Sequence, residues 1–442
     1  MIDERRTDVA LARACVYHSV GFDLRNLAGA ALRPESNPTA AGERDVKRFE
    51  DAFAGYVGVR HCSAFAYARS AIHFALATQA FDPGSEIIMS PITIKPMMDA
   101  VLSLGLRPVF VDIDPDSLIF DLADFDEMVG PQTRAVLLTY LFGVAADPRP
   151  IISRCRERGI FVIEDFSHNL GAAVDGRQLG TFGDVGVYSC SPTKTLDAYG
   201  GGLAVTDRAD LADELAARQM ELPHPPARRI RPKILRDLLL NVMSRKLVWS
   251  TFGFPLVRTL RRYAPHLELV LTAGPQRHQP TAQLAPDAFE RLSPRQARAG
   301  LAVLPAVARG DEIRRSNNAL LHTALRSVGA RFPLGTPGAR HVYWQSVVDV
   351  DDVSAVQAAL AKAGVDAGTT NLSLVAELGV YPEYERSCPT ARRVKESGLY
   401  VPAHVRVSSR GLRRVADALV SVLGAQLRAG QDVQHGHSGN GG

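Results

Sequence analysis

The sequence lacks the features that mark several large classes of protein. No stretch approaches the roughly 20 consecutive apolar residues that span a bilayer, and the first twenty residues carry charges of both signs without the apolar run of a secretory leader. Cysteine is scarce: the chain has five, none in CxxC spacing, at Cys15, Cys62, Cys155, Cys190 and Cys388. An odd, scattered set in a long chain argues against a disulfide framework, so we expect a cytoplasmic protein.

The composition has no extreme value either. Hydrophobic residues make up 46% of the 442-residue chain and charged residues 22%, which excludes global disorder and collagen-like structure. Single hydrophobic cores stop growing near roughly 250–300 residues, so the length predicts two domains. Residues 429–442 are polar and glycine-rich, which predicts a disordered tail. Its His435 and His437 would bind a metal only adventitiously, and we expect no metal site.

Six short apolar runs recur between residues 86 and 206, beginning with EIIMS and RPVFVDID and ending with DVGVYSCS and GGLAVT. Runs of about four to eight apolar residues without alternation are typical of strands in a mainly parallel sheet. Helical patterns lie between several of them, so we expect a doubly wound α/β domain over residues 45–222, after an N-terminal extension of residues 1–44. A smaller alternation predicts a helix linker and a small C-terminal α/β domain over residues 286–428.

Polar side chains cluster where two of these runs end. Asp165 is the last residue of FVIED and His168 follows it, while Ser189 lies in the next run, DVGVYSCS, and Lys194 follows that run. Ligands of such sheets bind outside the carboxyl ends of the strands, so we expect both clusters to face one crevice. This set fits pyridoxal phosphate, whose aldehyde binds a lysine amine as a Schiff base and whose ring nitrogen needs a carboxylate. Taken singly, such an Asp is more often a turn residue and such a Lys a solvated one.

Upstream, HCSAFAYARSAIHFALATQAF predicts a loop and then a helix that begins near Arg69 and Ser70. The unpaired N–H groups of a helix N-terminus can cradle a phosphate. By itself this signal is weak, and an ordinary helix cap at Ser70 is the simpler interpretation.

Four motifs together resemble the DegT/StrS-type aminotransferases, fold-type I pyridoxal phosphate enzymes that mostly aminate keto-sugars on nucleotide carriers. The resemblance covers roughly residues 45–425 and rests on DPGSEIIMSPITIKPMMDAVLSLGLRPVFVDID, VIEDFSHNLGA, GTFGDVGVYSCSPTKTL and RLSPRQARAGL. Their order is far more specific than any one of them. The resemblance implies an aspartate-aminotransferase-like fold with a large, mainly parallel sheet domain, pyridoxal 5'-phosphate as cofactor, and a homodimer.

The resemblance also implies roles for individual residues. Lys194 would bind the cofactor and move the proton, Asp165 would pair with the ring nitrogen, and His168, where the family usually has Gln, would contact the phenolic oxygen. The remaining cofactor contacts would come from Ser189, Arg69 and Ser70 at the phosphate and from Ile94 over the ring. The implied reaction moves an amino group from an amino acid, such as glutamate, to a keto-sugar or related cyclic ketone.

Several positions depart from the family pattern. Ala68-Arg69 replaces Gly-Thr, Ile94 replaces an aromatic residue, Phe289 replaces an Asn that reaches the partner subunit's phosphate, and Gly200 stands where Glu is common. Two alternatives therefore stay open: other pyridoxal phosphate chemistry, such as dehydration of a non-sugar or lipid-linked substrate, and a catalytically silent binding or regulatory homologue. The dehydrating branch of the family carries His in place of Lys194, which disfavours it here.

Positive charge is concentrated in an insertion, residues 223–285, where ten Lys or Arg and one Asp lie between residues 223 and 262. One helical face collects the apolar side chains of Ile234, Leu235, Leu238, Leu239 and Val242. This pattern is typical of an interfacial helix on an anionic membrane, here the inner membrane face. Two alternatives stay open for residues 228–262, a phosphate-bearing carrier and packing on the protein itself. Nucleic acid is not expected, because no basic-aromatic array accompanies the charges.

Overall fold

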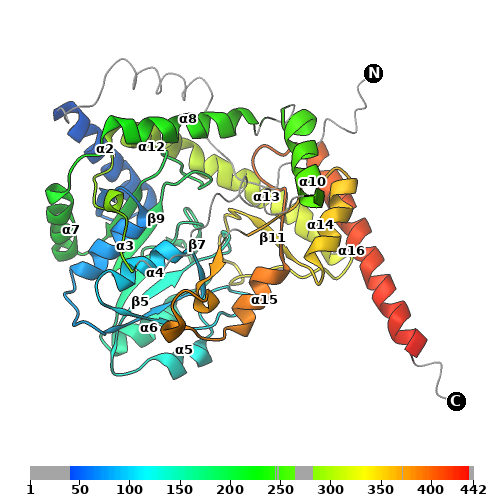
Figure 1. The fold of residues 1–442 in the computed structure, drawn as a ribbon, viewed down its shortest axis with the longest axis horizontal. Helices are drawn as coiled ribbons and strands as arrows, with labels where there is room; N and C mark the ends of the chain where they lie inside the picture. The colour runs from blue at the N-terminus through cyan, green and yellow to red at the C-terminus, as the bar shows by residue number, and fades with distance from the viewer. Residues whose placement is uncertain (1–39, 244, 246–247, 264–281, 371, 438–442) are drawn as a thin grey trace.

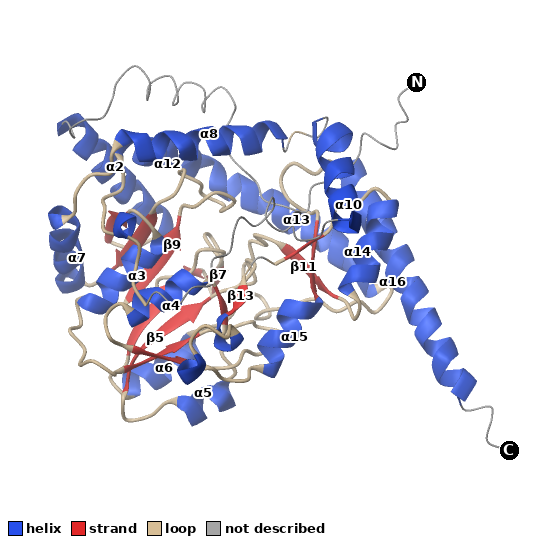
Figure 2. Cartoon of the chain, in the orientation of Figure 1, coloured by secondary structure: helices blue, strands red, loops and turns tan. Residues whose placement is uncertain are grey.

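A seven-stranded sheet forms the centre of the computed structural model, which describes residues 40–243, 245, 248–263, 282–370 and 372–437. Helices cover both faces of the sheet (Figure 1), and the strands lie between them (Figure 2). The strand order is β1-β10-β9-β6-β5-β2-β4. The strands are β1 (His61–Phe65), β2 (Glu86–Met89), β4 (Arg107–Phe110), β5 (Thr133–Thr139), β6 (Phe161–Asp165), β9 (Val185–Ser189) and β10 (Gly202–Thr206).

Only β10 opposes the direction of its neighbours within this sheet, since it pairs antiparallel with β1 and β9 while the other pairs are parallel. All six predicted strands are present, and the mainly parallel α/β fold class is confirmed. Because β6 and β9 are adjacent and parallel, their carboxyl ends meet at one edge of the sheet. Asp165 and Ser189 are the last residues of these two strands.

Two hydrophobic cores fill the space between the sheet and its helices. Alternate residues of a strand point to opposite faces: Val136 and Leu138 of β5 belong to one core, and Leu137 belongs to the other. The helices of this domain are α2 (Ala40–Val57), α3 (Ala68–Ala77), α4 (Lys95–Leu102), α5 (Leu122–Met128), α6 (Arg149–Glu157) and α7 (Ala209–Glu221). Of the predicted N-terminal extension, residues 1–39 lie outside the described residues.

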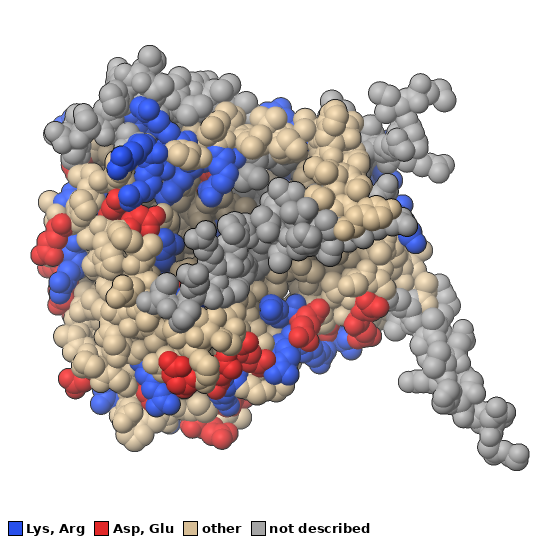
Figure 3. Space-filling model, viewed as in Figure 1, with Lys and Arg blue, Asp and Glu red and all other residues tan. Residues whose placement is uncertain are grey.

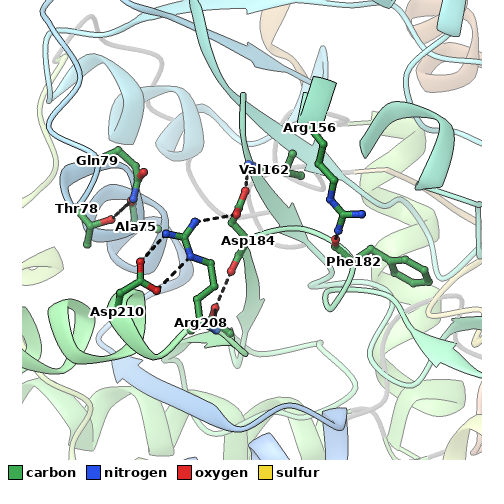
Figure 4. A network of polar contacts seen from close by, with 10 residues as sticks. Ala75, Thr78, Gln79, Arg156, Val162, Phe182, Asp184, Arg208 and Asp210 are labelled. Carbon is green, nitrogen blue, oxygen red and sulfur yellow. Dashed lines mark hydrogen bonds and ion pairs between the residues drawn. The ribbon is translucent and has the colours of Figure 1, made fainter. Parts of the chain in front are cut away.

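A polar network fastens the end of the sheet opposite the candidate site (Figure 4). One carboxylate oxygen of Asp184 accepts the Val162 N–H at 2.8 Å, and the other binds Arg208 at 3.0 Å. Arg208 also binds Asp210 in the first turn of α7 at 2.6 Å. The starts of β6 and β9 are thereby tied to the end of β10, which fixes the register of the strands that carry the site.

A small second domain follows, as predicted. Its three-stranded antiparallel sheet, in the order β11-β14-β12, packs on helices around a third hydrophobic core. The strands are β11 (Ser346–Asp349), β12 (Gly368–Thr369) and β14 (Gly398–Val401), and the helices are α13 (Val307–Arg326), α14 (Val353–Lys362), α15 (Pro389–Ser397) and α16 (Ser409–His437). The helix linker is α12 (Pro294–Val303), which begins with a capping box of Ser293 and Gln296.

The C-terminal end differs from the prediction of a disordered tail over residues 429–442. Helix α16 continues to His437, and residues 438–442 lie outside the described residues. The physical reason is that extending an existing helix costs far less than nucleating one, so the glycines at 430 and 436 do not end it.

The insertion forms α8 (Ala227–Met243), a π-helical turn (Trp249–Gly253) and α10 (Phe254–Tyr263). The predicted single apolar face of α8 is divided. Ile234 is buried in the main core and Leu238 is partly buried, whereas Leu235 and Leu239 are exposed. Within the described part of the chain, no helix is both long enough and apolar enough to cross a bilayer.

Candidate functional site

A cavity of about 180 Å³ opens at the carboxyl ends of β5, β6 and β9. Its lining includes the predicted residues Asp165, His168, Ser189, Lys194 and Ile94. The prediction that the two polar clusters face one crevice is therefore confirmed. The fold achieves this because parallel neighbours end at the same edge of the sheet.

Asp165 supplies the carboxylate of the cavity. It is buried at the end of β6, and its Oδ1 accepts the N–H of Ser167 at 3.0 Å. Burial raises the pKa of Asp165, while the bonds from Ser167 and the charge of Lys194 act in the opposite direction. Its neighbour Glu164 points to the other face of the sheet, where it binds the Tyr140 hydroxyl at 2.5 Å. Only one member of this acidic pair therefore belongs to the site.

Lys194 is presented by a strained loop. Thr193 adopts a φ of 80°, a conformation that a β-branched side chain rarely takes and that is often found at functional sites. The buried Tyr188 hydroxyl steadies the loop by accepting the N–H of Leu196 at 2.9 Å. Desolvation lowers the pKa of Lys194 to about 8, although Asp165 partly opposes the shift. About a tenth of the amine is therefore neutral and nucleophilic at pH 7, far more than for an ordinary lysine.

His168 is held as a neutral ring with a defined hydrogen-bonding pattern. Its Nδ1 faces the backbone N–H of Phe142 at 3.3 Å and accepts that hydrogen bond. Burial, and then the charge of Lys194, lowers the pKa of His168 well below its usual value. A neutral imidazole that accepts at Nδ1 carries its proton on Nε2. His168 can therefore donate a hydrogen bond from Nε2, as the Gln common at this position would from its amide.

Trp344 is a site residue that the sequence reasoning missed. Its indole stacks on the His168 ring with centroids 3.9 Å apart and an interplanar angle of 14°. The indole N–H donates to the Thr193 carbonyl at 2.7 Å, and the Lys194 Nζ lies 4.6 Å from the ring centroid. One signal in the sequence could have predicted an aromatic residue here. Ile94 stands where the family has an aromatic residue, so the ring of the cofactor would need an aromatic side chain from another part of the chain.

The first turn of α3 has the character of an anion cradle. The helix is capped at Tyr67, so the interpretation of Ser70 as an ordinary cap is wrong. The Ser70 hydroxyl is fully buried and has no hydrogen-bond partner among the described residues. A buried hydroxyl without a partner in this turn fits the oxygen atoms of a phosphate group.

The glycine run after Lys194 lets this turn approach the lysine loop. A Cβ at Gly202 would lie 2.2 Å from the carbonyl carbon of Tyr67. Gly201 forms a bridge with Tyr67, and its carbonyl accepts the N–H of Cys190 at 2.9 Å. The cradle and the Ser189 strand end are therefore adjacent, and the residues present fit pyridoxal phosphate.

Two predicted phosphate contacts lie outside the cavity lining. Arg69 places its guanidinium 3.6 Å from the centroid of the Tyr67 ring and 3.7 Å from Asp287. Ser70 lies in the same turn but does not line the cavity. Phe289, in the place of the family's Asn, packs edge-on against His73 with centroids 5.3 Å apart.

Comparison with known proteins identifies the family of the chain. The sequence matches the DegT/DnrJ/EryC1/StrS aminotransferase family over residues 33–223 and 273–420. It is 34% identical over 170 residues to the spore coat polysaccharide biosynthesis protein SpsC of Bacillus subtilis, a match that covers 38% of this chain and 44% of that protein. It is 33% identical over 172 residues to the GDP-perosamine synthase of Caulobacter vibrioides, which covers 39% of this chain and 46% of that protein. The chain thus spans less than half the length of these relatives.

Solved structures share the fold over nearly the whole chain. An aminotransferase from Psychrobacter cryohalolentis superposes with a TM-score of 0.70 at 18% identity, covering 93% of this chain and 98% of that one. A DegT DnrJ EryC1 StrS aminotransferase from Brucella abortus gives a TM-score of 0.66 at 22% identity, covering 91% and 96%. The predicted aminotransferase fold of type I is confirmed. Since the family match covers most of the chain on both sides of the insertion, this chain belongs to the DegT/DnrJ/EryC1/StrS aminotransferase family.

Proposed function

We propose that the protein is a pyridoxal 5'-phosphate-dependent aminotransferase that moves an amino group from an amino acid, such as glutamate, to a keto-sugar or related cyclic ketone. The observation that carries the proposal is the convergence of Lys194, Asp165 and His168 on one cavity. The names of relatives support the substrate class. They include the GDP-perosamine synthase above and an L-glutamine:2-deoxy-scyllo-inosose aminotransferase of Streptomyces kanamyceticus, 32% identical over 186 residues.

The side chains divide the work of holding the cofactor. Lys194 would bind its aldehyde, Asp165 would keep its ring nitrogen protonated, and His168 would donate from Nε2 to its phenolic oxygen. Ser70 and the N–H groups of the first turn of α3 would hold its phosphate, with Ser189 beside them. When bound, the cofactor supplies an electron-withdrawing ring that stabilises negative charge on the substrate carbon.

Lys194 is also suited to move the proton. Its lowered pKa of about 8 gives an amine that can accept a proton from a carbon atom and return it near neutral pH. Apolar side chains of the cavity wall, Met97, Leu141, Trp344 and Leu372, restrict water around it. Restricting water strengthens the electrostatic contacts of Lys194 with Asp165.

Absorption spectroscopy tests the proposal. The protein loaded with pyridoxal phosphate should absorb visible light, and Lys194→Ala should remove that band. Glutamate alone should then bleach the wild-type band, because only a transaminase accumulates the amino form of its cofactor. A colourless wild type would contradict the cofactor assignment. A coloured protein that glutamate does not bleach would favour other pyridoxal phosphate chemistry or a silent homologue.

We also propose a homodimer in the cytoplasm. The resemblance to the family supports the dimer, and the four described cysteines, which are free and buried, fit a reducing compartment. Light scattering coupled to size-exclusion chromatography measures the assembly directly. A monomer that binds the cofactor normally would contradict the dimer and leave the chemistry intact.

A further inference from the structure

The insertion helix α8 has an unusual orientation on the protein. Its inner side buries Asp237 and Asn241 together with Ile230 and Ile234, while its outer side exposes 56% of Leu235 and 58% of Leu239. In a helix that merely covers a soluble protein, the leucines face inward and the polar residues face water. Exposed leucines over buried polar residues indicate that the outer side meets something other than water.

Polar contacts fix α8 in this orientation. Arg229 forms an ion pair with Glu290, and the Lys233 Nζ donates to the Tyr67 hydroxyl at 3.1 Å. Further along the helix, Arg406 donates to the Asn241 side-chain oxygen at 2.9 Å. A rotation of α8 that buried Leu235 and Leu239 would break these contacts. The two leucines are therefore exposed in the stable fold of the protein.

The rest of the insertion also exposes large apolar side chains. The π-helical turn exposes 71% of Phe252, and α10 exposes 54% of Leu256 and 73% of Tyr263. Both α8 and α10 lie along the upper edge of the molecule in the view of Figure 1. Aromatic side chains of this kind favour the boundary between water and lipid.

Positive charge accompanies these apolar side chains. Arg228, Arg231, Arg236 and Arg245 are exposed on and just after α8, and blue side chains gather over part of α8 in Figure 3. The segment from residue 223 to 262 carries ten basic residues and one acidic residue. Pairing this surface with the same surface of a second copy would bring like charges together. An anionic bilayer would attract the arginines through its negative headgroups and bury the leucines in its apolar layer.

We propose that α8 and α10 form an interfacial binding surface for a bilayer that contains anionic phospholipid. The family match in sequence omits residues 224–272, the stretch that contains α8 and α10. The proposal does not depend on the reaction that the cavity performs, because the surface and the cavity use different residues.

Flotation with phospholipid vesicles tests the proposal. The full chain should float with vesicles of phosphatidylglycerol and phosphatidylcholine, float much less with phosphatidylcholine alone, and detach as salt screens the charges. The double substitution Leu235→Ser/Leu239→Ser should weaken vesicle binding by about tenfold or more, because two apolar side chains leave the lipid.

A control of equal apolar loss is available elsewhere on the surface. Met220 and Leu334 are 65% and 54% exposed outside the insertion, so Met220→Ser/Leu334→Ser should bind vesicles like the wild type. The charge variant Arg228→Gln/Arg245→Gln should weaken binding by about twenty-five-fold, at roughly fivefold per arginine.

Three results would overturn the proposal. In the first, the wild type stays with the vesicle-free fraction at low salt. In the second, Leu235→Ser/Leu239→Ser turns a dimer into monomers while vesicle binding is absent, which would assign the surface to a second copy. In the third, the protein binds inorganic pyrophosphate through the insertion but binds no vesicles. The cofactor absorbance should be the same in every variant, which separates this test from that of the proposed function.

Discussion

At the scale of single residues, burial sets the charge states that the cavity needs. The same desolvation lowers the pKa of Lys194 and of His168 and raises that of Asp165. The contacts between these groups modify the effect without reversing it. Burial therefore favours a neutral His168 imidazole and increases the neutral fraction of the Lys194 amine.

The reactivity of Lys194 should follow this shift. In cofactor-free protein, labelling of Lys194 by pyridoxal and borohydride should rise as pH increases through about 8, since the neutral amine is the nucleophile. Asp165 raises the pKa of Lys194, so Asp165→Asn should move the midpoint to lower pH. Peptide mapping measures the labelling, and Lys194→Ala provides the blank. A midpoint near 10 in the wild type would contradict the desolvated environment.

Trp344 should report on the cofactor and help to bind it. The chain has two tryptophans, so Trp249→Phe leaves Trp344 as the only indole, and cofactor binding should quench its fluorescence strongly. Trp344→Leu should weaken cofactor affinity by about fivefold to tenfold through loss of an aromatic contact of about 1 kcal/mol. Trp249→Phe itself should bind the cofactor with unchanged affinity. An unquenched Trp344 would show that the indole does not border the bound cofactor.

At the scale of elements, the close approach of α3 to β10 forms the turn that we propose as the phosphate cradle. Gly202→Ala should push the first turn of α3 away, because its Cβ would lie 2.2 Å from Tyr67 backbone. We expect a loss of cofactor affinity of at least about tenfold together with a lower melting temperature.

Gly55→Ala is the matched control for this prediction. Gly55 lies within α2, and a Cβ there would have no heavy atom within 4 Å. This substitution should raise stability by about 0.5–1 kcal/mol and leave cofactor affinity unchanged. Equal cofactor affinity in the two variants, measured by titration of the visible band, would exclude a role for the close approach.

The elements show what the sequence could and could not predict. The strand ends that carry Asp165 and Ser189 could be predicted, because buried runs of β-branched residues identify parallel strands and parallel strands end together. Trp344 could not, because it reaches the cavity through backbone bonds from Val342 and Gln345 to the distant loop at 142–143. The division of the α8 face was equally hidden. It depends on hydrogen bonds from α8 to Tyr67 and Arg406. These partners are distant in the sequence, so the periodicity of the helix does not predict them.

At the scale of the whole molecule, the C-terminal half completes the cavity and is fastened to the sheet edge. Trp344 and Leu372 from this half line the cavity. Asp112, just after β4, accepts the N–H groups of Thr390 and Ala391 in the first turn of α15, both at 2.9 Å. A carboxylate at a helix N-terminus is favourable both as a hydrogen-bond acceptor and as a negative charge. The cavity walls therefore depend on contacts far from the chemistry.

Arg386 attaches the C-terminal half to the large domain through three hydrogen bonds. It donates to Asp124 through both terminal nitrogens, at 2.6 and 2.5 Å, and to the Phe110 carbonyl at 2.9 Å. This pairing lowers the pKa of Asp124, so its stabilisation is complete above the usual carboxyl pKa and is lost only as pH falls below it. At pH 7 Arg386→Leu should therefore cost about 1–3 kcal/mol of unfolding free energy.

The same substitution should also weaken cofactor binding, because the half of the chain that carries Trp344 loses one of its attachments to the sheet domain. Arg392→Leu is the matched control: Arg392 pairs with Glu377 at 2.7 Å within the C-terminal half itself, so its loss should leave cofactor affinity unchanged and cost less than about 1 kcal/mol. Thermal unfolding and cofactor titration of both variants measure the two effects separately. If Arg386→Leu lowers the melting temperature but binds the cofactor like the wild type, the walls of the cavity are held by the large domain alone.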